Sequence, residues 1–159
     1  MNNKILEIKK INKNFQHRNK LIQIFKNVNL NIKKGDLVAL VGPSGSGKST
    51  LLNMISLIDI PTSGQIIFNN RDVKNLKEEE KDDLRKKHIS MIFQDNNLLS
   101  DFTAIENVLL PLIIRGEKTK LSNKKAEKIL ISFNLKNRQN HYPDELSGGE
   151  QQRVAIARA

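Results

Sequence analysis

The stretch that most constrains this chain runs from residue 42 to residue 50 and reads Gly-Pro-Ser-Gly-Ser-Gly-Lys-Ser-Thr. It follows the apolar run 37–41, which we expect to be a buried β-strand. It precedes residues 51–57, whose apolar spacing predicts a helix. A strand, a G-x-x-x-x-G-K-[ST] loop and a helix in this order are typical of a phosphate-binding loop. We therefore interpret the stretch as a nucleotide-binding site; the alternative is a Gly/Ser-rich turn before an ordinary helix.

The residue types of this loop suit a bound anion. Glycines let successive backbone N–H groups turn toward phosphate oxygens, where a Cβ would obstruct them. The following helix, which we expect to start near Lys48, adds its positive dipole end to the same anion. We expect Lys48 to reach the β- and γ-phosphates and the Ser49 hydroxyl to bind Mg²⁺. The predicted nucleotide-binding residues of the loop are Gly42, Pro43, Ser44, Gly45, Ser46, Gly47, Lys48, Ser49 and Thr50.

Composition argues against several other classes of function. The chain has 27 Lys and Arg against 17 Asp and Glu, but the lysines are scattered and have no interleaved aromatic residues. Nucleic-acid binding is therefore not expected. The absence of cysteine excludes disulfides and thiolate metal sites. No signal-like apolar core begins the chain, and the apolar run 108–114 is too short to cross a bilayer. We expect a cytosolic protein whose membrane role comes through a partner.

The remaining pattern predicts an α/β domain that carries a helical insertion. The expected strands cover residues 4–15, 22–33, 37–41, 65–68 and 89–93. The first two should form an antiparallel β-subdomain beside the phosphate loop. The expected helices are one that starts near Lys48 and includes residues 51–57, a charged segment 78–87, a segment that a capping box opens at Thr103, and an amphipathic segment 123–133. Pro111 should kink or end the third of these helices.

A second motif, Leu-Ser-Gly-Gly-Glu, occupies residues 146–150. Ser147 and Glu150 have the spacing of a capping box. Two glycines in a first helical turn are poor helix formers, so they make sense where a phosphate approaches the helix N-terminus closely. The alternative is a flexible helix cap.

Together these two motifs resemble those of the ATP-binding subunits of ABC transporters. The resemblance covers the whole chain and implies an α/β P-loop NTPase fold of the ABC ATPase type, with an N-terminal antiparallel β-subdomain and a helical insertion subdomain. It implies one domain over 1–159. Its parts would be a RecA-like core with the β-subdomain (1–97), a helical subdomain (98–146), and the signature motif with the start of the next helix (147–159).

The resemblance also assigns roles to individual residues. Lys48 and Gln94 correspond to the catalytic residues, and Gln94 looks like the glutamine that meets Mg²⁺ together with Ser49. Phe15 looks like the aromatic residue that stacks on adenine, although tyrosine is commoner there; the alternative is that Phe15 simply packs in the core. In a head-to-tail homodimer, the signature residues would act on the ATP of the opposite subunit. These residues are Ser147, Gly148, Gly149 and Glu150.

Within the family, residues 97–108 with the following Pro111 and Leu112 look most like the lipoprotein-releasing ATPases. Related macrolide-export and cell-division ATPases are the alternatives. The resemblance implies a peripheral protein at the cytoplasmic face of the inner membrane. It would hydrolyse ATP to drive integral membrane permease subunits that dock at residues 95–114. The alternative for this segment is that its apolar residues simply pack the helical subdomain. The sequence does not identify the cargo.

After residues that correspond to Ala157, Arg158 and Ala159, the family continues into a strand that ends in Asp-Glu, then a D-loop and a switch histidine. We therefore expect residues 1–159 to be truncated before the Walker B motif and inactive by themselves. Two other classes remain open: a nucleotide-binding module without turnover, and a soluble ABC-type protein of DNA repair or translation.

Overall fold

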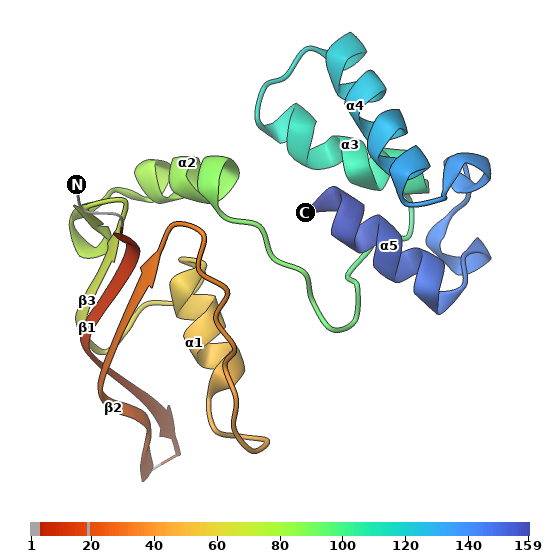
Figure 1. Ribbon diagram of the computed structural model, residues 1–159. Helices are drawn as coiled ribbons and strands as arrows, with labels where there is room; N and C mark the ends of the chain where they lie inside the picture. The colour runs from red at the N-terminus through yellow and green to blue at the C-terminus, as the bar shows by residue number, and fades with distance from the viewer. Residues whose placement is uncertain (1–3, 19) are drawn as a thin grey trace. The chain divides into compact units, whose positions relative to one another are not determined.

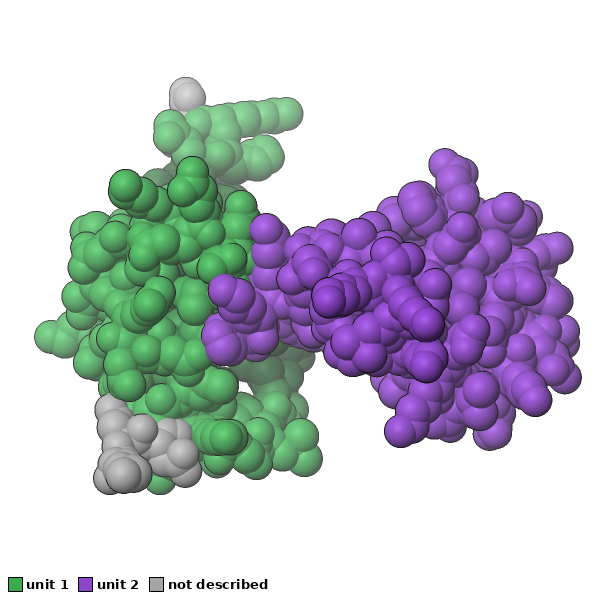
Figure 2. All heavy atoms as spheres, turned by 90° about the horizontal axis from the view of Figure 1, so that it is seen from above, with its two compact units in different colours: residues 1–85 green, residues 86–159 purple. Residues whose placement is uncertain are grey.

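The computed structural model describes residues 4–18 and 20–159. They fall into two compact units, residues 1–85 and residues 86–159 (Figure 2). Each unit is described by itself. The expected division at residues 97 and 146 stays a prediction.

Unit 1 contains a four-stranded antiparallel sheet with the order β2-β1-β3-β4 (Figure 1). The strands are β1 (Lys4–His17), β2 (Lys20–Lys33), β3 (Ser63–Phe68) and β4 (Arg71–Asp72). Alternate residues of the central strands are buried on one apolar face: Leu6 and Ile8 in β1, and Ile66 and Phe68 in β3. Ile11 is also buried, three residues after Ile8, because the pairing of β1 shifts register between them. The strands expected at 4–15, 22–33 and 65–68 are confirmed.

Unit 1 also contains helix α1 (Lys48–Ile55), the 3-10 helix Val73–Asn75 and most of helix α2 (Glu78–His88), whose last three residues belong to unit 2. Helix α1 follows the glycine-rich loop and buries Leu51 and Met54. It begins at Lys48, where the sequence predicts the helix start, and ends two residues before the last predicted position, Leu57. Helix α2 buries Leu84 alone among its residues. Its charged surface confirms the solvated helix that the sequence predicts there.

Two of the predicted strands are wrong. Residues 37–41 form no strand, and Leu37 and Val41 are 102% and 85% exposed. Residues 89–93 are also irregular, and Ile92 is 54% exposed. An apolar run becomes a buried strand only when neighbouring strands accept its backbone hydrogen bonds. Neither run pairs with any strand in the described part of the chain.

Unit 2 is a small helical assembly. Its helices are α3 (Ala104–Ile114), α4 (Thr119–Ser132) and α5 (Gly148–Arg158), joined in part by the 3-10 turns Lys136–Arg138 and Pro143–Glu145. Their shared core consists of Ala104, Val108, Ala126, Leu130, Leu135, Leu146 and Val154. The helix expected at 123–133 is confirmed, with an earlier start. No helix within residues 4–18 and 20–159 combines the length and the apolar character needed to cross a bilayer.

The first helix of this unit does not end at its proline, which is one of the two effects expected of Pro111; the other, a kink, stays a prediction. The capping box at Thr103 is present, as predicted. Pro111, however, lies inside α3, and the helix continues through it for three more residues. The carbonyl oxygen of Pro111 still accepts a hydrogen bond from the Arg115 amide at 3.1 Å, so the last turn remains closed after the proline.

Candidate functional site

The glycine-rich loop of residues 42–47 ends at the N-terminus of α1. Gly47 caps that helix with a φ of 90°, a backbone conformation that favours glycine. A Cβ added to Gly47 would lie 2.5 Å from Ile24 Cγ2 and 2.8 Å from Phe25 Cζ. Glycine is therefore required here both by the backbone and by the side chains of β2. The same distances place β2 directly against the loop.

Lys48 folds back across this loop. Its Nζ donates hydrogen bonds of 2.8 Å to the carbonyl oxygens of Gly42 and Pro43. The first turn of α1 contains no acidic residue and its N-cap supplies no side-chain hydrogen bond. The positive end of the helix dipole is therefore not offset by a local carboxylate. An ammonium group and a helix N-terminus together form a site for an anion such as a phosphate.

The side chains near the loop suit a magnesium ion that takes most of its ligands from bound phosphates and water. Among residues 4–18 and 20–159, no three His, Cys, Asp or Glu side chains gather as a metal site. Mg²⁺ usually retains several waters and takes only one or two protein ligands beside substrate phosphates. The exposed Ser49 hydroxyl, in the first turn of α1, is suited to be such a ligand. Gln94, the second expected ligand, belongs to unit 2.

Phe15 lies near the end of β1, opposite Ile22 of β2, and is 42% exposed. The hairpin that carries it also carries Ile24 and Phe25, which lie against Gly47. Unit 1 therefore brings an accessible aromatic ring and the glycine-rich loop onto connected elements. This arrangement suits a ligand that has a flat base at one end and phosphates at the other.

In unit 2, Gln94 occupies an exposed turn after the irregular run 89–93. The segment that follows it is held by two residues that the sequence interpretation missed. Arg158 donates to the carbonyl oxygens of Asn97 at 2.7 Å and Asn96 at 2.8 Å. Burial lowers the pKa of its guanidinium from the ordinary value. The position of the backbone after Gln94 thus depends on the last residue of α5.

The second missed residue is Asn107, which is fully buried in α3. Its Nδ2 donates to the carbonyl oxygens of Phe102 at 2.9 Å and of Leu99 and Thr103 at 3.1 Å each. Its Oδ1 accepts a hydrogen bond of 2.9 Å from the Leu99 amide. The sequence signal was an amide beside Glu106 in a helical run that is otherwise apolar.

The N-terminus of α5 carries the second motif, and its capping box is present as predicted. Glu150 Oε2 accepts hydrogen bonds of 2.8 Å from the Ser147 amide and hydroxyl, while Oε1 accepts one of 2.9 Å from Arg138 Nε. The Arg138 hydrogen bond, followed by those from Ser147, lowers the pKa of Glu150 to about 2. A Cβ added to Gly148 would meet open space. The carboxylate is thus folded back onto the cap, beside an accessible glycine.

The structure places the expected site residues in two groups. The loop 42–50 and Phe15 belong to unit 1, whereas Gln94 and residues 147–150 belong to unit 2. Lys13, which contacts the Phe15 ring, was also missed by the sequence interpretation.

Comparison with known proteins identifies the family. A profile described as "ABC transporter" matches residues 25–159. The chain is 45% and 44% identical, over all 159 residues, to the lipoprotein-releasing system ATP-binding proteins LolD of Rickettsia bellii and Rickettsia typhi, and covers 70% of each. It is 46% identical to LolD of Bacteroides fragilis over 87% of this chain and 64% of that protein.

Solved structures agree with these relatives. A dimeric structure of MJ0796, a bacterial ABC transporter cassette, is 42% identical and superposes with a TM-score of 0.88 over 96% of this chain and 68% of that chain. A post-hydrolysis state of the same cassette, bound to ADP and Pi, has the same TM-score and coverage. The glycine-rich loop with its folded-back lysine and the Ser-capped helix α5 therefore belong to a chain of the ABC transporter family with the fold of its ATP-binding cassettes.

Proposed function

We propose that the protein is the ATP-binding subunit of an ABC transporter and hydrolyses ATP to drive lipoprotein release through a membrane partner. The observation that carries this proposal is Lys48, whose ammonium crosses an open glycine-rich loop at the uncapped N-terminus of α1. The similarity to LolD supports the lipoprotein-releasing assignment.

In this proposal the chain binds ATP through unit 1. The loop amides and Lys48 hold the phosphates, and adenine stacks on Phe15. Ser49 would bind Mg²⁺, and a bound Mg²⁺ would neutralise part of the phosphate charge. Catalysis of phosphoryl transfer consists mainly of positioning and charge stabilisation, which are the tasks that these donors can perform.

Unit 2 would complete the site of a second copy. Two copies would pair head to tail, so that Ser147, Gly148 and Gly149 of one copy contact the γ-phosphate of the other. The dimeric state of the MJ0796 cassette supports pairing, and the accessible α5 N-terminus supports this use of it. Glu150, bound to Arg138, would keep its negative charge turned away from the phosphate. Gln94 would contact Mg²⁺ and the attacking water.

Residues 95–114 would dock the membrane-embedded permease subunits, at the cytoplasmic face of the inner membrane. Val108 is buried in the core of unit 2, so only part of this segment is available. Leu99 and Phe102 are 40% and 39% exposed and precede the capped start of α3. Exposed apolar side chains of this kind suit a protein partner.

The test is the full-length protein with Lys48→Ala. A charge-assisted hydrogen bond contributes about 1.5–3 kcal/mol, so loss of this ammonium should weaken ATP binding about 10- to 150-fold. Calorimetric titration with Mg-ATP measures the affinity, and a turnover assay should show the same loss. Lys120→Ala, an exposed lysine of α4, is the matched control and should bind ATP like the wild type. Equal affinities for Lys48→Ala and the wild type would refute the site.

A further inference from the structure

On the basis of the proposed function, we propose that Lys13 is a positioning residue for the nucleotide base: it holds the Phe15 ring in place for stacking and fixes that ring relative to the phosphate loop. Lys13 lies in β1 and is 7% exposed, which is unusual for a lysine. A lysine is retained inside a protein when its charge is compensated. The contacts of Lys13 show what compensates it.

The ammonium group of Lys13 contacts three electron-rich groups. Its Nζ donates to Asp59 Oδ1 at 2.6 Å and to the carbonyl oxygen of Ile60 at 2.7 Å. It also lies 4.8 Å from the centroid of the Phe15 ring. An ammonium has three N–H donors, so the two oxygens leave one side of the cation facing the ring. The buried charge is thus shared between an ion pair and a cation–π contact.

The cation–π contact fixes a ring that packing alone holds weakly. Phe15 remains 42% exposed, so much of its surface has no protein neighbour. A side chain that is ordered before the ligand arrives avoids part of the entropy cost of binding. The contact of Lys13 with the ring therefore preorganises Phe15 for stacking on a base.

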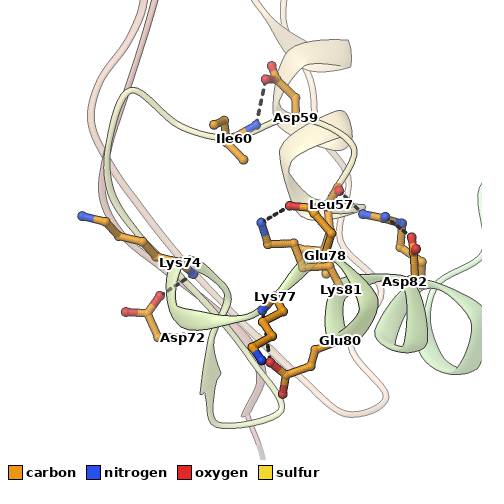
Figure 3. A network of polar contacts seen from close by, with 11 residues as sticks. Leu57, Asp59, Ile60, Asp72, Lys74, Lys77, Glu78, Glu80, Lys81 and Asp82 are labelled. Carbon is orange, nitrogen blue, oxygen red and sulfur yellow. Dashed lines mark hydrogen bonds and ion pairs between the residues drawn. The ribbon is translucent and has the colours of Figure 1, made fainter.

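The same lysine connects the ring to the helix that begins at the phosphate loop. Asp59 and Ile60 belong to the turn after α1, and Figure 3 shows the Asp59 carboxylate accepting the Ile60 amide, at 2.7 Å. That turn is closed onto α1 by the Asp59 amide, which donates to the Asn53 carbonyl oxygen at 3.1 Å. Lys13 therefore joins β1 to the C-terminal end of α1.

The hairpin is also held at the other end of α1, where Ile24 lies against Gly47. The distance between the aromatic ring and the phosphate loop is thus set by contacts at both ends of one helix. Of these, the Lys13 contact is the one that touches the ring itself. Its loss should affect the part of the nucleotide that the ring touches, the base, more than the phosphates.

The experiment compares two ligands on the full-length protein by calorimetry: ATP, and inorganic tripolyphosphate, which has no base. The test variant is Lys13→Met, made alone and together with Asp59→Asn so that no carboxylate is left unpaired. Loss of a cation–π contact should weaken ATP binding about three- to tenfold. Tripolyphosphate binding should stay close to the wild-type value. Lys13→Arg, which keeps a cation, should restore ATP affinity.

A second arm tests whether Lys13 acts through the ring. In a Phe15→Leu background, Lys13→Met should cause no further loss of ATP affinity. An equal loss for both ligands, or an undiminished effect without the ring, would overturn the proposal and leave Lys13 as a purely structural residue. Failure of the proposed function looks different: the wild type would then bind neither ligand, or Lys48→Ala would bind ATP with the affinity of the wild type.

Discussion

Asn107 is the side chain whose replacement should most directly test how unit 2 holds its exposed apolar segment. The amide is fully buried and joins α3 to residues 99–103 through side-chain hydrogen bonds to Leu99, Phe102 and Thr103. Asn107→Leu keeps a similar side-chain size but removes every one of these bonds. It therefore separates the hydrogen bonds from the packing.

The expected loss of stability can be worked out from the contacts. The amide has two N–H donors, and its oxygen accepts the Leu99 amide, so about three good hydrogen bonds disappear at about 1 kcal/mol each. The carbonyl oxygens and the Leu99 amide that bind Asn107 would face a leucine side chain, which offers no hydrogen bond. Their lost partners add a desolvation cost to the loss of stability. For a domain of about 150–250 residues, a loss of about 3 kcal/mol lowers the melting temperature by about 6–12 °C.

Thermal unfolding of the full-length protein, followed by circular dichroism, measures this shift. The control is Asn123→Leu at an exposed position of α4, which should melt close to the wild type. Hydrogen exchange should also show faster exchange of the Leu99 amide in Asn107→Leu. If Asn107→Leu melts like the control and the Leu99 amide stays protected, the hydrogen bonds of this amide do not hold the segment.

Three further predictions concern other parts of the chain. A Cβ at Gly64, whose φ is 96°, would lie 2.4 Å from a carbonyl oxygen of β1. Gly64→Ala should therefore lower the melting temperature several degrees more than the control Gly35→Ala, where φ is 89° and the space is open. Equal melting temperatures of the two variants would contradict this. Because the pKa of Glu150 is lowered to about 2 from 4.5, its carboxylate stabilises the cap of α5 fully above pH 4.5, and this stabilisation is lost as the pH falls toward 2. A carboxyl NMR titration with a midpoint at 4.5 would refute that. Leu99→Asp and Phe102→Asp in the full-length protein should keep ATP binding but no longer co-purify with membrane subunits; loss of ATP binding with a much lower melting temperature would assign the residue to the core instead.

Local sequence patterns predicted the parts of this structure that local physics determines. The capping boxes at Thr103 and Ser147 depend on side chains three residues apart, and both are present. The β1–β2 hairpin follows from alternating apolar residues. The loop before Lys48 follows from glycine, whose backbone freedom a short motif can reveal.

The contacts that the sequence did not reveal join residues far apart in the chain. Lys13 meets Asp59 across 46 positions, and Arg158 meets Asn96 across 62. No periodicity or spacing marks such a pair. The runs 37–41 and 89–93 failed for a related reason: apolar character predicts burial, but a strand also needs a neighbouring strand, which the run itself does not specify.

Helix α5 connects two functional segments, one at each of its ends. It spans Gly148–Arg158, and at about 1.5 Å per residue it forms a rod about 16 Å long. Ser147 caps its N-terminus, and its last residue, Arg158, donates hydrogen bonds to the carbonyl oxygens of Asn96 and Asn97. A three-turn helix resists bending, so a displacement of its N-terminal cap would move the whole helix, including Arg158, as a rigid body. In the proposed dimer, α5 would therefore work as a lever that transmits the arrival of a nucleotide in one copy to the backbone after Gln94 in the other.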